Sequence, residues 1–163
     1  MKRLICLMLC FLMTLLSGCH SESTGETAFY YCRDPQQHQY FEDGSVIHAE
    51  YRDLLGHRDD LQYMVGLYLA GPMEEGLLSP FPKTTRLLSI QKEQDEIIVE
   101  LSEHGQTIPD SAFSLACACL TLTCVNFTDC QTVTVNSGDR SMTMHADQII
   151  LLDTLPQQET SGG

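Results

Sequence analysis

The sequence predicts an α+β fold in a single domain, arranged as a split β-α-β-β-α-β sheet with two helices packed on one face. The order of the segments carries this prediction, because one amphipathic and one nearly all-apolar helical segment each separate stretches that alternate like strands. Gly, Pro or charged residues mark the boundaries between these segments. The length of 163 residues suits one domain once an N-terminal signal is set aside.

The N-terminal segment is expected to lie outside that domain. Two basic residues precede a short apolar run at 4–16, which is typical of a signal peptide rather than a membrane-spanning helix. The run ends in LSGC and resembles the bacterial lipobox, which implies that Cys19 is lipidated and becomes the mature N-terminus. An ordinary signal peptide or an uncleaved anchor is the alternative. We therefore expect a signal peptide at 1–18, a polar tether at 19–27 and a lipid anchor on the outer face of the cell membrane.

The domain itself, expected over 28–152, opens with two extended segments. Aromatic residues at 28–33 are followed by DPQQHQ, which predicts a strand and then a break. The Asp-Gly pair at 43–44 is a turn signal. The residues after it, 46–52, are expected as an extended arm or an edge strand. The polar residues at 153–163 are expected as a disordered tail.

The clearest helix is expected to begin after an acidic cap, Asp59 or Asp60. Its apolar residues recur at the spacing of one helical face, namely Leu61, Met64, Val65, Tyr68 and Leu69. Gly71 stands where a left-handed C-terminal cap is favoured, and Pro72 prevents the helix from continuing.

The loop after this helix is unusually apolar, since it carries Leu77, Leu78 and Phe81 between prolines. We expect these side chains to cover one end of the core, with Pro80 and Pro82 reducing the entropy that is lost when the loop becomes ordered. The alternative is that the three residues form an interaction loop for a partner.

A hairpin is expected next, from the segments at 85–93 and 95–103. The second segment alternates apolar and polar residues, so one face of the hairpin should be buried and the other mostly wet. The apolar residues of the two segments are expected at Leu88, Ile90, Ile97, Val99 and Leu101.

A second helix should begin near Ile108, because Pro109 suits a first turn and Asp110 favours a helix N-terminus. Residues 111–127 are apolar nearly all round, so this helix should be well buried. The alternation within 131–138 predicts a strand that ends at a Gly turn, and a further short strand is expected after it.

The composition is strongly acidic, with 9 Lys and Arg against 22 Asp and Glu and a net charge of −13. Such a charge repels the phosphates of nucleic acids and the headgroups of anionic lipids, so we expect no nucleic-acid partner. Solubility explains the acidity, and a basic partner is the alternative explanation.

Five cysteines follow Cys19, namely Cys32, Cys117, Cys119, Cys124 and Cys130. An odd number cannot pair completely within one chain, which leaves their redox state open. Burial as small apolar residues is one explanation. A metal site is the other, and it makes a metal-binding envelope lipoprotein that uses His and Cys residues the alternative function. Because the C-x-C-x4-C-x5-C spacing matches no established zinc pattern, we expect no metal and no cofactor.

Residues that would indicate an enzyme are sparse. The histidines downstream of the signal are scattered along the sequence. Ser102, Glu103 and His104 are adjacent, but neighbouring strand residues point to opposite faces and do not build a triad. The sequence also lacks a Gly-rich phosphate loop. We therefore expect a protein that is not an enzyme and that has no small-molecule substrate.

The segment from LYLAGP to IIVELSE resembles the GerMN domain. That family shows a leucine-rich helix, Gly-Pro, a GL.SP.P.GT.LLS segment and a strand that ends in an acidic residue, Leu and Ser. The matching residues are Gly71, Pro72, Gly76, Leu77, Ser79, Pro80, Pro82, Thr85, Leu87, Leu88, Ser89, Leu101 and Ser102. The resemblance extends over 28–144, with Lys83 in place of a usual Gly and a second helix that is unusually rich in Cys.

The resemblance implies a small α/β domain on the outer side of the membrane, often part of a lipoprotein and associated with sporulation and spore germination. Similar domains build rings by self-association or docking, and no catalytic residues come with the family. We therefore expect a non-enzymatic, membrane-tethered binding or assembly module. It would dock through a sheet edge or the interaction loop of Leu77, Leu78 and Phe81. Its partner would be a cell-envelope protein or a second copy, and the lipid on Cys19 would reach the membrane.

Overall fold

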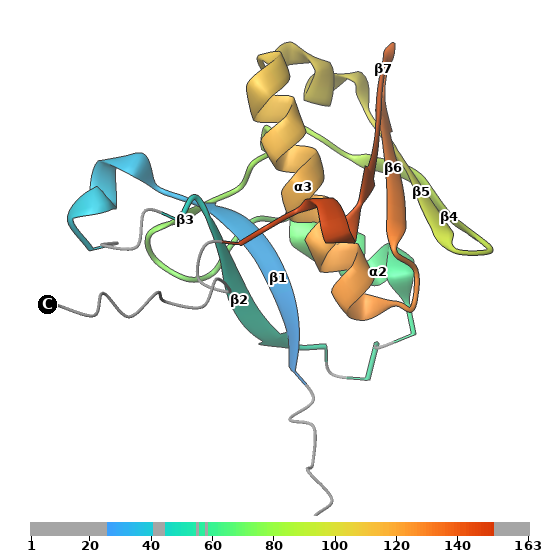
Figure 1. The fold of residues 1–163 in the computed structure, drawn as a ribbon, viewed down its shortest axis with the longest axis horizontal. Coiled ribbons are helices and arrows are strands. Elements are labelled where there is room, and N and C mark those ends of the chain that lie inside the picture. The colour runs from blue at the N-terminus through green and yellow to red at the C-terminus, as the bar shows by residue number, and fades with distance from the viewer. Residues whose placement is uncertain (1–25, 41–44, 55, 58, 152–163) are drawn as a thin grey trace, which may run out of the picture.

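The computed structural model describes residues 26–40, 45–54, 56–57 and 59–151 (Figure 1). Cys19 and the predicted signal peptide lie outside the described residues, as do the tether up to residue 25 and the predicted tail.

The strands of the described residues form two separate sheets (Figure 1). The first has the order β2-β1-β3, is antiparallel throughout, and consists of β1 (Glu26–Arg33), β2 (Ile47–Asp53) and β3 (Leu77–Leu78). The second has the order β4-β5-β6-β7 and consists of β4 (Leu87–Glu93), β5 (Glu96–Leu101), β6 (Thr132–Ser137) and β7 (Arg140–His145). Only β5 and β6 run parallel in this second sheet, and its other pairs are antiparallel.

Helices and short turns connect these strands. Within the described part of the chain, the α-helices are α2 (Leu61–Leu69) and α3 (Asp110–Phe127). Three short 3-10 helices are η1 (Pro35–Tyr40), η2 (Glu103–Thr107) and η3 (Ala146–Gln148). Helix α3 is the crossover between the parallel strands β5 and β6, and it lies between the two sheets (Figure 1).

The α+β class and the single domain are confirmed, but the expectation of one continuous sheet is wrong. The physical reason lies at the edge of β1 that a larger sheet would need. Strand β3 pairs with β1 only at Cys32 and Arg33. Further along that edge, the amide of Tyr30 donates to Thr123 Oγ1 at 2.9 Å, and Asn126 Nδ2 of α3 donates to the carbonyl of Ala28 at 3.5 Å. Helix α3 therefore occupies the place of a further strand.

Helix α2 begins and ends where its sequence predicts. The Asp60 side chain accepts a hydrogen bond from the amide of Tyr63 at 2.8 Å, which is the action of an N-cap. After the last turn, Gly71 adopts a φ of 98°, a left-handed conformation that Gly enters without steric cost. Tyr68 of α2 stacks on Tyr31 of β1 with ring centroids 5.0 Å apart, so α2 touches the first sheet. It also contacts β4 of the second sheet and helix α3.

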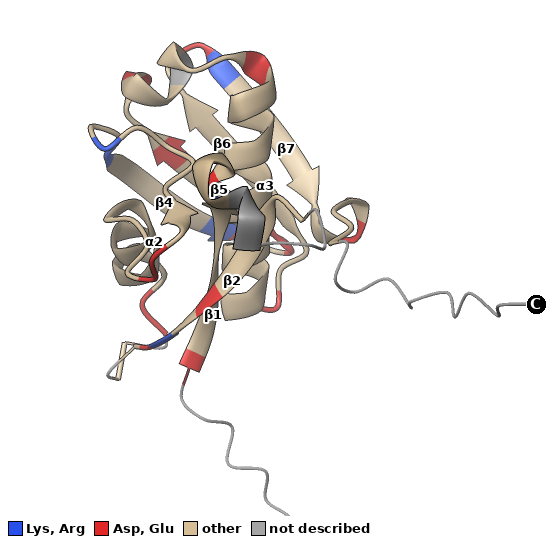
Figure 2. Cartoon of the chain, turned by 90° about the vertical axis from the view of Figure 1, so that its left-hand side faces the viewer, with Lys and Arg blue, Asp and Glu red and all other residues tan. Residues whose placement is uncertain are grey.

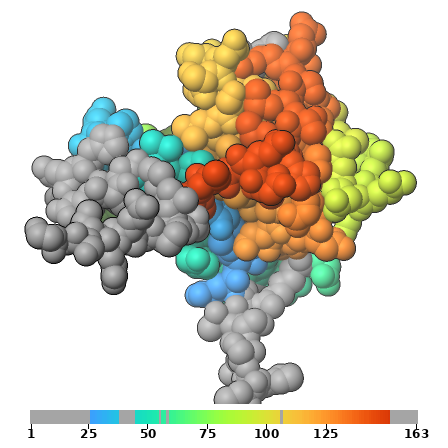
Figure 3. Space-filling view, viewed as in Figure 1, coloured from blue at the N-terminus to red at the C-terminus, as the bar shows by residue number. Residues whose placement is uncertain are grey.

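The β4–β5 hairpin departs from expectation at one residue. Its turn contains Gln94 with a φ of 53°. Ile97, Val99 and Leu101 of β5 are buried as predicted, but Leu88 of β4 is 67% exposed. The register shifts between Leu87 and Ser89, and this irregularity turns Leu88 outward. In the space-filling view the hairpin forms an outer edge of the molecule (Figure 3).

Helix α3 is the main core helix. It begins at Asp110, two residues after the predicted start near Ile108, and Pro109 is its N-cap rather than part of its first turn. Its most buried residues are at most 1% exposed, namely Phe113, Ala116, Cys117, Cys119 and Leu120. Its length and mean hydropathy of 1.3 would suffice for a membrane span, but half of it is buried inside the protein. It contacts β1, β6, β7 and η3, and the last described residues cover part of it in Figure 3.

Candidate functional site

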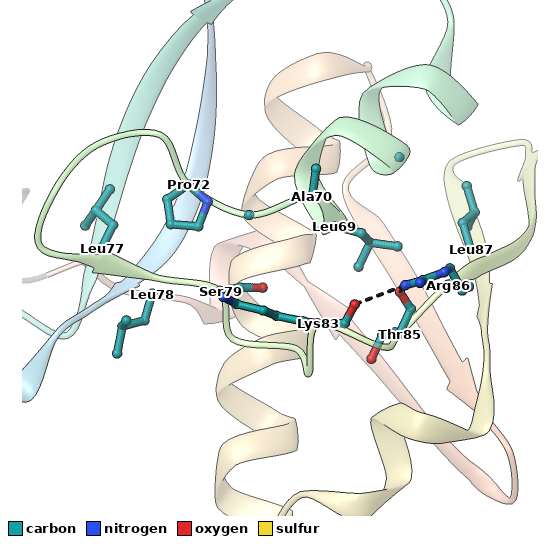
Figure 4. A pocket seen from close by; sticks show the side chains of 12 residues that line it. Leu69, Ala70, Pro72, Leu77, Leu78, Ser79, Lys83, Thr85, Arg86 and Leu87 are labelled. Atoms are coloured by element: carbon teal, nitrogen blue, oxygen red, sulfur yellow. Dashed lines mark hydrogen bonds between the residues drawn. The ribbon is translucent and has the colours of Figure 1, made fainter.

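An open groove of about 650 Å³ lies at the end of α2. It runs between this helix end, strand β3, the loop that follows β3 and the start of β4 (Figure 4). The residues that line it are Gly66, Leu69, Ala70, Gly71, Pro72, Leu77, Leu78, Ser79, Lys83, Thr85, Arg86 and Leu87. We call it the α2 groove.

A buried ion pair on β2 fixes one wall of the α2 groove. Glu50 and Arg52 are only 5% and 7% exposed and contact each other directly. Arg52 Nη2 donates to the carbonyl of Gly71 at 2.7 Å, and its guanidinium lies 5.0 Å from the ring centroid of Phe29. Both charges sit on the face of β2 that points toward α2, so the pair holds the end of the helix in place.

The carboxylate of Glu50 secures the next residues of the chain. Its Oε2 accepts hydrogen bonds from the amides of Met73 at 2.8 Å and Glu74 at 2.9 Å. Burial alone would raise the pKa of Glu50, but the bonds from Arg52 and these two amides outweigh it and hold the pKa below its ordinary value. Glu50 is therefore a carboxylate at neutral pH, and the Gly-Pro turn is fixed by charge-assisted bonds.

The opposite wall is held by the loop's own hydrogen bonds. Ser79 Oγ donates to the carbonyl of Phe81 at 3.1 Å, and Arg86 Nη1 donates to the carbonyl of Lys83 at 3.0 Å (Figure 4). The amide of Arg86 donates to Ser102 Oγ at 3.0 Å, which ties the loop to the end of β5. This wall is thus as well defined as the first one.

The predicted interaction loop divides between core and surface. Leu77 and Phe81 are 7% and 3% exposed and belong to the hydrophobic core, which confirms the packing interpretation for these two. Leu78 is 45% exposed and lines the α2 groove. The alternation of β3 explains the split, because successive strand residues point to opposite faces. Of the three, Leu78 is the residue that a partner can reach.

The α2 groove has a different charge from the protein as a whole. Lys83 and Arg86 line it, and no Asp or Glu is among its lining residues. The chain carries 22 acidic residues against 9 basic ones, and Figure 2 shows how sparsely Lys and Arg are distributed along the ribbon. Apolar side chains with two cations at one rim favour a ligand that combines an apolar side chain with carboxylates.

The structure brings Ser102 and His104 together, which strand alternation did not predict. Strand β5 ends at Leu101 and η2 begins at Glu103, so the chain turns there and Ser102 Oγ lies 3.3 Å from His104 Nδ1. The Ser102 hydroxyl already accepts the amide of Arg86, and it stands at the end of a strand as expected. The contact between Ser102 and His104 results from the local turn of the chain and does not form an activated nucleophile.

The five cysteines that the structure describes do not assemble a metal centre. Cys32, Cys117, Cys119, Cys124 and Cys130 are all free thiols. Among the residues that the structure describes, no three His, Cys, Asp or Glu side chains are grouped so that they could hold a metal ion. The alternative function as a metal-binding protein therefore has no site within the described residues.

Sequence reasoning missed Glu50 and Arg52, which position the groove. The segment that carries these two charges was expected as an extended arm or an edge strand, with no role for the charges. Observed as β2, this segment is indeed an edge strand. The available signal was spacing, since residues two apart on a strand share a face and opposite charges there can pair.

Comparisons with known proteins identify the family to which this chain belongs. The model of the family Germane, described as sporulation and spore germination, matches residues 28–143. The fold is similar to the tandem GerMN domains of the sporulation protein GerM from Bacillus subtilis, with 14% identity and a TM-score of 0.49. That match covers 71% of this chain and 39% of the other, so this chain spans about two fifths of that structure's length.

A second similar structure is a candidate lipoprotein from Clostridium perfringens. It shows 16% identity and a TM-score of 0.46 over 78% of this chain and 90% of the other. No curated protein matches the chain. Because the family model covers most of the sequence, the chain belongs to the Germane family of sporulation and spore germination, and the predicted resemblance to the GerMN domain is confirmed.

Proposed function

We propose that this protein is a non-enzymatic docking module of the bacterial cell envelope, tethered to the outer face of the membrane and acting in sporulation or germination. The observation that carries the proposal is the α2 groove, an open and rigidly walled hollow with exposed Leu78 between Lys83 and Arg86 on one side and the end of α2 on the other. Fixed walls reduce the entropy that is lost on binding, which is what a docking surface requires.

The partner that fits the groove is a protein segment with an apolar side chain flanked by carboxylates. The apolar side chain would contact Leu69, Leu78 and Leu87, and the carboxylates would lie near the two cations. A second copy of this acidic chain meets that description, as does another acidic envelope protein.

The membrane tether of the proposal rests on the lipobox at Cys19. Strand β1 begins at Glu26, seven residues later, and seven extended residues span at most about 25 Å. A lipid on Cys19 would thus keep the start of β1 within about 25 Å of the bilayer surface. Cys19→Ala should release the protein from the membrane fraction into the soluble fraction. If the protein without the substitution were found in the soluble fraction to the same extent, the lipid anchor on Cys19 would be contradicted.

The docking role is tested by a photo-crosslinking amino acid placed at Leu78 in intact cells. We expect a discrete adduct that is lost when Lys83 and Arg86 are both replaced by Glu. The same amino acid at Leu88 is the matched control, because Leu88 is an exposed leucine on the other sheet. Equal adducts at both positions, or none at Leu78, would refute docking at the groove.

Sedimentation across a range of concentrations separates the two kinds of partner. A second copy predicts concentration-dependent assembly of the purified protein, and the Lys83→Glu, Arg86→Glu double variant should remain monomeric. A different envelope protein predicts a strict monomer together with an adduct of higher mass in the crosslinking experiment.

A further inference from the structure

Two cysteine thiols from distant parts of the chain touch each other beneath the first sheet. Cys32 Sγ on β1 and Cys119 Sγ on α3 are 4.0 Å apart, although 87 positions separate them in the sequence. A disulfide has a sulfur–sulfur distance of about 2 Å. The two sulfur atoms must therefore approach by about 2 Å, which is within the reach of side-chain rotation.

The backbones that carry the two thiols are already held together. The amide of Tyr30 donates to Thr123 Oγ1 at 2.9 Å, and Thr123 Oγ1 itself donates to the carbonyl of Cys119 at 2.9 Å. One hydroxyl group thus links β1, two residues before Cys32, to the helical turn that carries Cys119. The relative position of the two elements is set by these bonds before any covalent bond forms.

The two thiols differ in their access to solvent. Cys32 is partly exposed and lines a second hollow of about 310 Å³ with Leu78, Pro80 and Leu115. Cys119 is completely buried. A reagent can therefore reach Cys32 first, and Cys119 only through Cys32.

The electrostatics of the pair assign the same roles. The hydrogen bond with Cys119 lowers the pKa of the Cys32 thiol, and the same bond together with burial raises the pKa of Cys119. Burial raises the pKa of Cys117 and of Cys124 to about 12. Among these four thiols, Cys32 is the one that most readily provides a thiolate, the reactive form in exchange reactions.

We propose that Cys32 and Cys119 are a dithiol that closes to an intramolecular disulfide by exchange with an external organic disulfide at the Cys32 hollow. The Cys32 thiolate attacks one sulfur of the external disulfide, forms a mixed disulfide, and releases the other half as a thiolate that takes up a proton. Cys119 then transfers its proton to solvent and attacks Cys32 Sγ, which releases the second half as a thiol. The protein loses two protons and two electrons, and the external disulfide takes up both to become two thiols.

Closure would join β1 covalently to the core helix. The bridge spans a loop of the chain that includes β2, α2, β3 and the β4–β5 hairpin, and such a long loop loses much of its freedom in the unfolded chain. An exported protein meets disulfide-forming conditions that a cytosolic protein does not meet. The remaining described cysteines, Cys117, Cys124 and Cys130, would stay reduced. An odd number of cysteines in the domain is therefore compatible with one disulfide.

The test uses the reduced full chain, treated in its native state with glutathione disulfide. The reaction is quenched, the free thiols are alkylated after unfolding, and peptides are mapped by mass. We expect one cross-linked peptide pair that contains Cys32 and Cys119, with the loss of two hydrogens, and alkylation of Cys117, Cys124 and Cys130. The oxidised protein should have a higher Tm than the reduced protein, and a dithiol should reverse this difference.

Two variants check the assigned order of events. Cys119→Ser should leave Cys32 as a stable mixed disulfide with glutathione, because the second attack is removed. Cys117→Ser is the matched control, since Cys117 is also fully buried on α3, and it should keep the cross-link. A persistent glutathione adduct on Cys32 in the unaltered protein would overturn the proposal. So would a Cys32 that stays unmodified, or a bridge between any other two cysteines.

Discussion

Glu50 and Arg52 form a buried ion pair that binds backbone groups of Gly71, Met73 and Glu74. The pair thereby positions one wall of the α2 groove, although neither residue lines the groove itself. Replacing Glu50 by Gln leaves Arg52 buried beside a neutral amide. We expect the free energy of unfolding to fall by about 2–4 kcal/mol. Urea denaturation at neutral pH measures this change, and Glu75→Gln is the control because Glu75 is exposed. Equal effects of the two substitutions would contradict the role of the pair.

The same carboxylate should make stability depend on pH. Its pKa in the folded protein is held below the ordinary value, so its contribution is present above the unfolded pKa of about 4.3. The contribution is lost as the pH falls through the lower folded pKa. The difference in free energy of unfolding between the native protein and Glu50→Gln should therefore shrink below about pH 4. A difference that stays constant from pH 7 to pH 3 would show that ionisation of Glu50 is irrelevant.

Two glycines near the α2 groove should respond to Ala in opposite directions. Gly71 has a φ of 98°, so Gly71→Ala should cost about 1–2 kcal/mol of stability through backbone strain. A Cβ on Gly71 would approach Ser79 Cβ no closer than 3.9 Å, so crowding is not the cause. Gly66 lies within α2 with open space around it, and Gly66→Ala should stabilise by about 0.5–1 kcal/mol. Thermal unfolding measures the change in stability of both variants. If both substitutions raised or both lowered the stability, this account would be contradicted.

Thr123 and Thr121 form a matched pair of buried hydroxyls on α3. Thr123→Val removes the acceptor for the amide of Tyr30 and should cost about 1–3 kcal/mol. The hydroxyl of Thr121 has no hydrogen-bond partner among the described residues, so Thr121→Val should be neutral or stabilising. Hydrogen exchange at Tyr30 adds a local measurement, and it should accelerate only in the Thr123 variant. Protection that survives in Thr123→Val would show that α3 does not close this edge.

Substitutions at Phe81 and Leu78 should distinguish the role of this loop in core packing from its role in docking. Phe81→Ala opens a cavity in the core and should cost about 3–5 kcal/mol. Leu78→Ala should change stability by less than about 0.5 kcal/mol, because the side chain is largely at the surface. The proposed crosslinking readout should respond to Leu78 instead. A large loss of stability in Leu78→Ala would argue that this residue is structural.

Local features of the fold could be predicted from the sequence, since their causes are local. The Asp60 cap, the apolar stripe and the Gly71 stop of α2 lie within a dozen residues, and each acts on its immediate neighbours. The start of α3 beside Pro109 and the alternation of β5 are of the same kind. In each case the residues that determine the conformation are those that adopt it.

The division into two sheets depends on contacts that the sequence does not display. Strand β3 has two residues, too few for a visible alternation, and Leu78 pairs with Cys32 far back in the chain. Thr123 and Asn126, the residues of α3 that bond to β1, look like ordinary helix residues in the sequence. The sequence therefore predicted the groove only through its apolar loop, including the burial of Phe81. The pairing of Glu50 with Arg52 was not apparent.

The closure of β1 by α3 sets the order in which this protein can become complete. The chain emerges from the ribosome N-terminus first, so β1 and β2 can pair early as neighbours. Thr123 and Asn126 follow 93 and 98 positions after the groups that they bind. Until then one edge of β1 remains open to another chain. Folding must await the C-terminal third of the sequence, and a truncated product would carry a strand ready to aggregate.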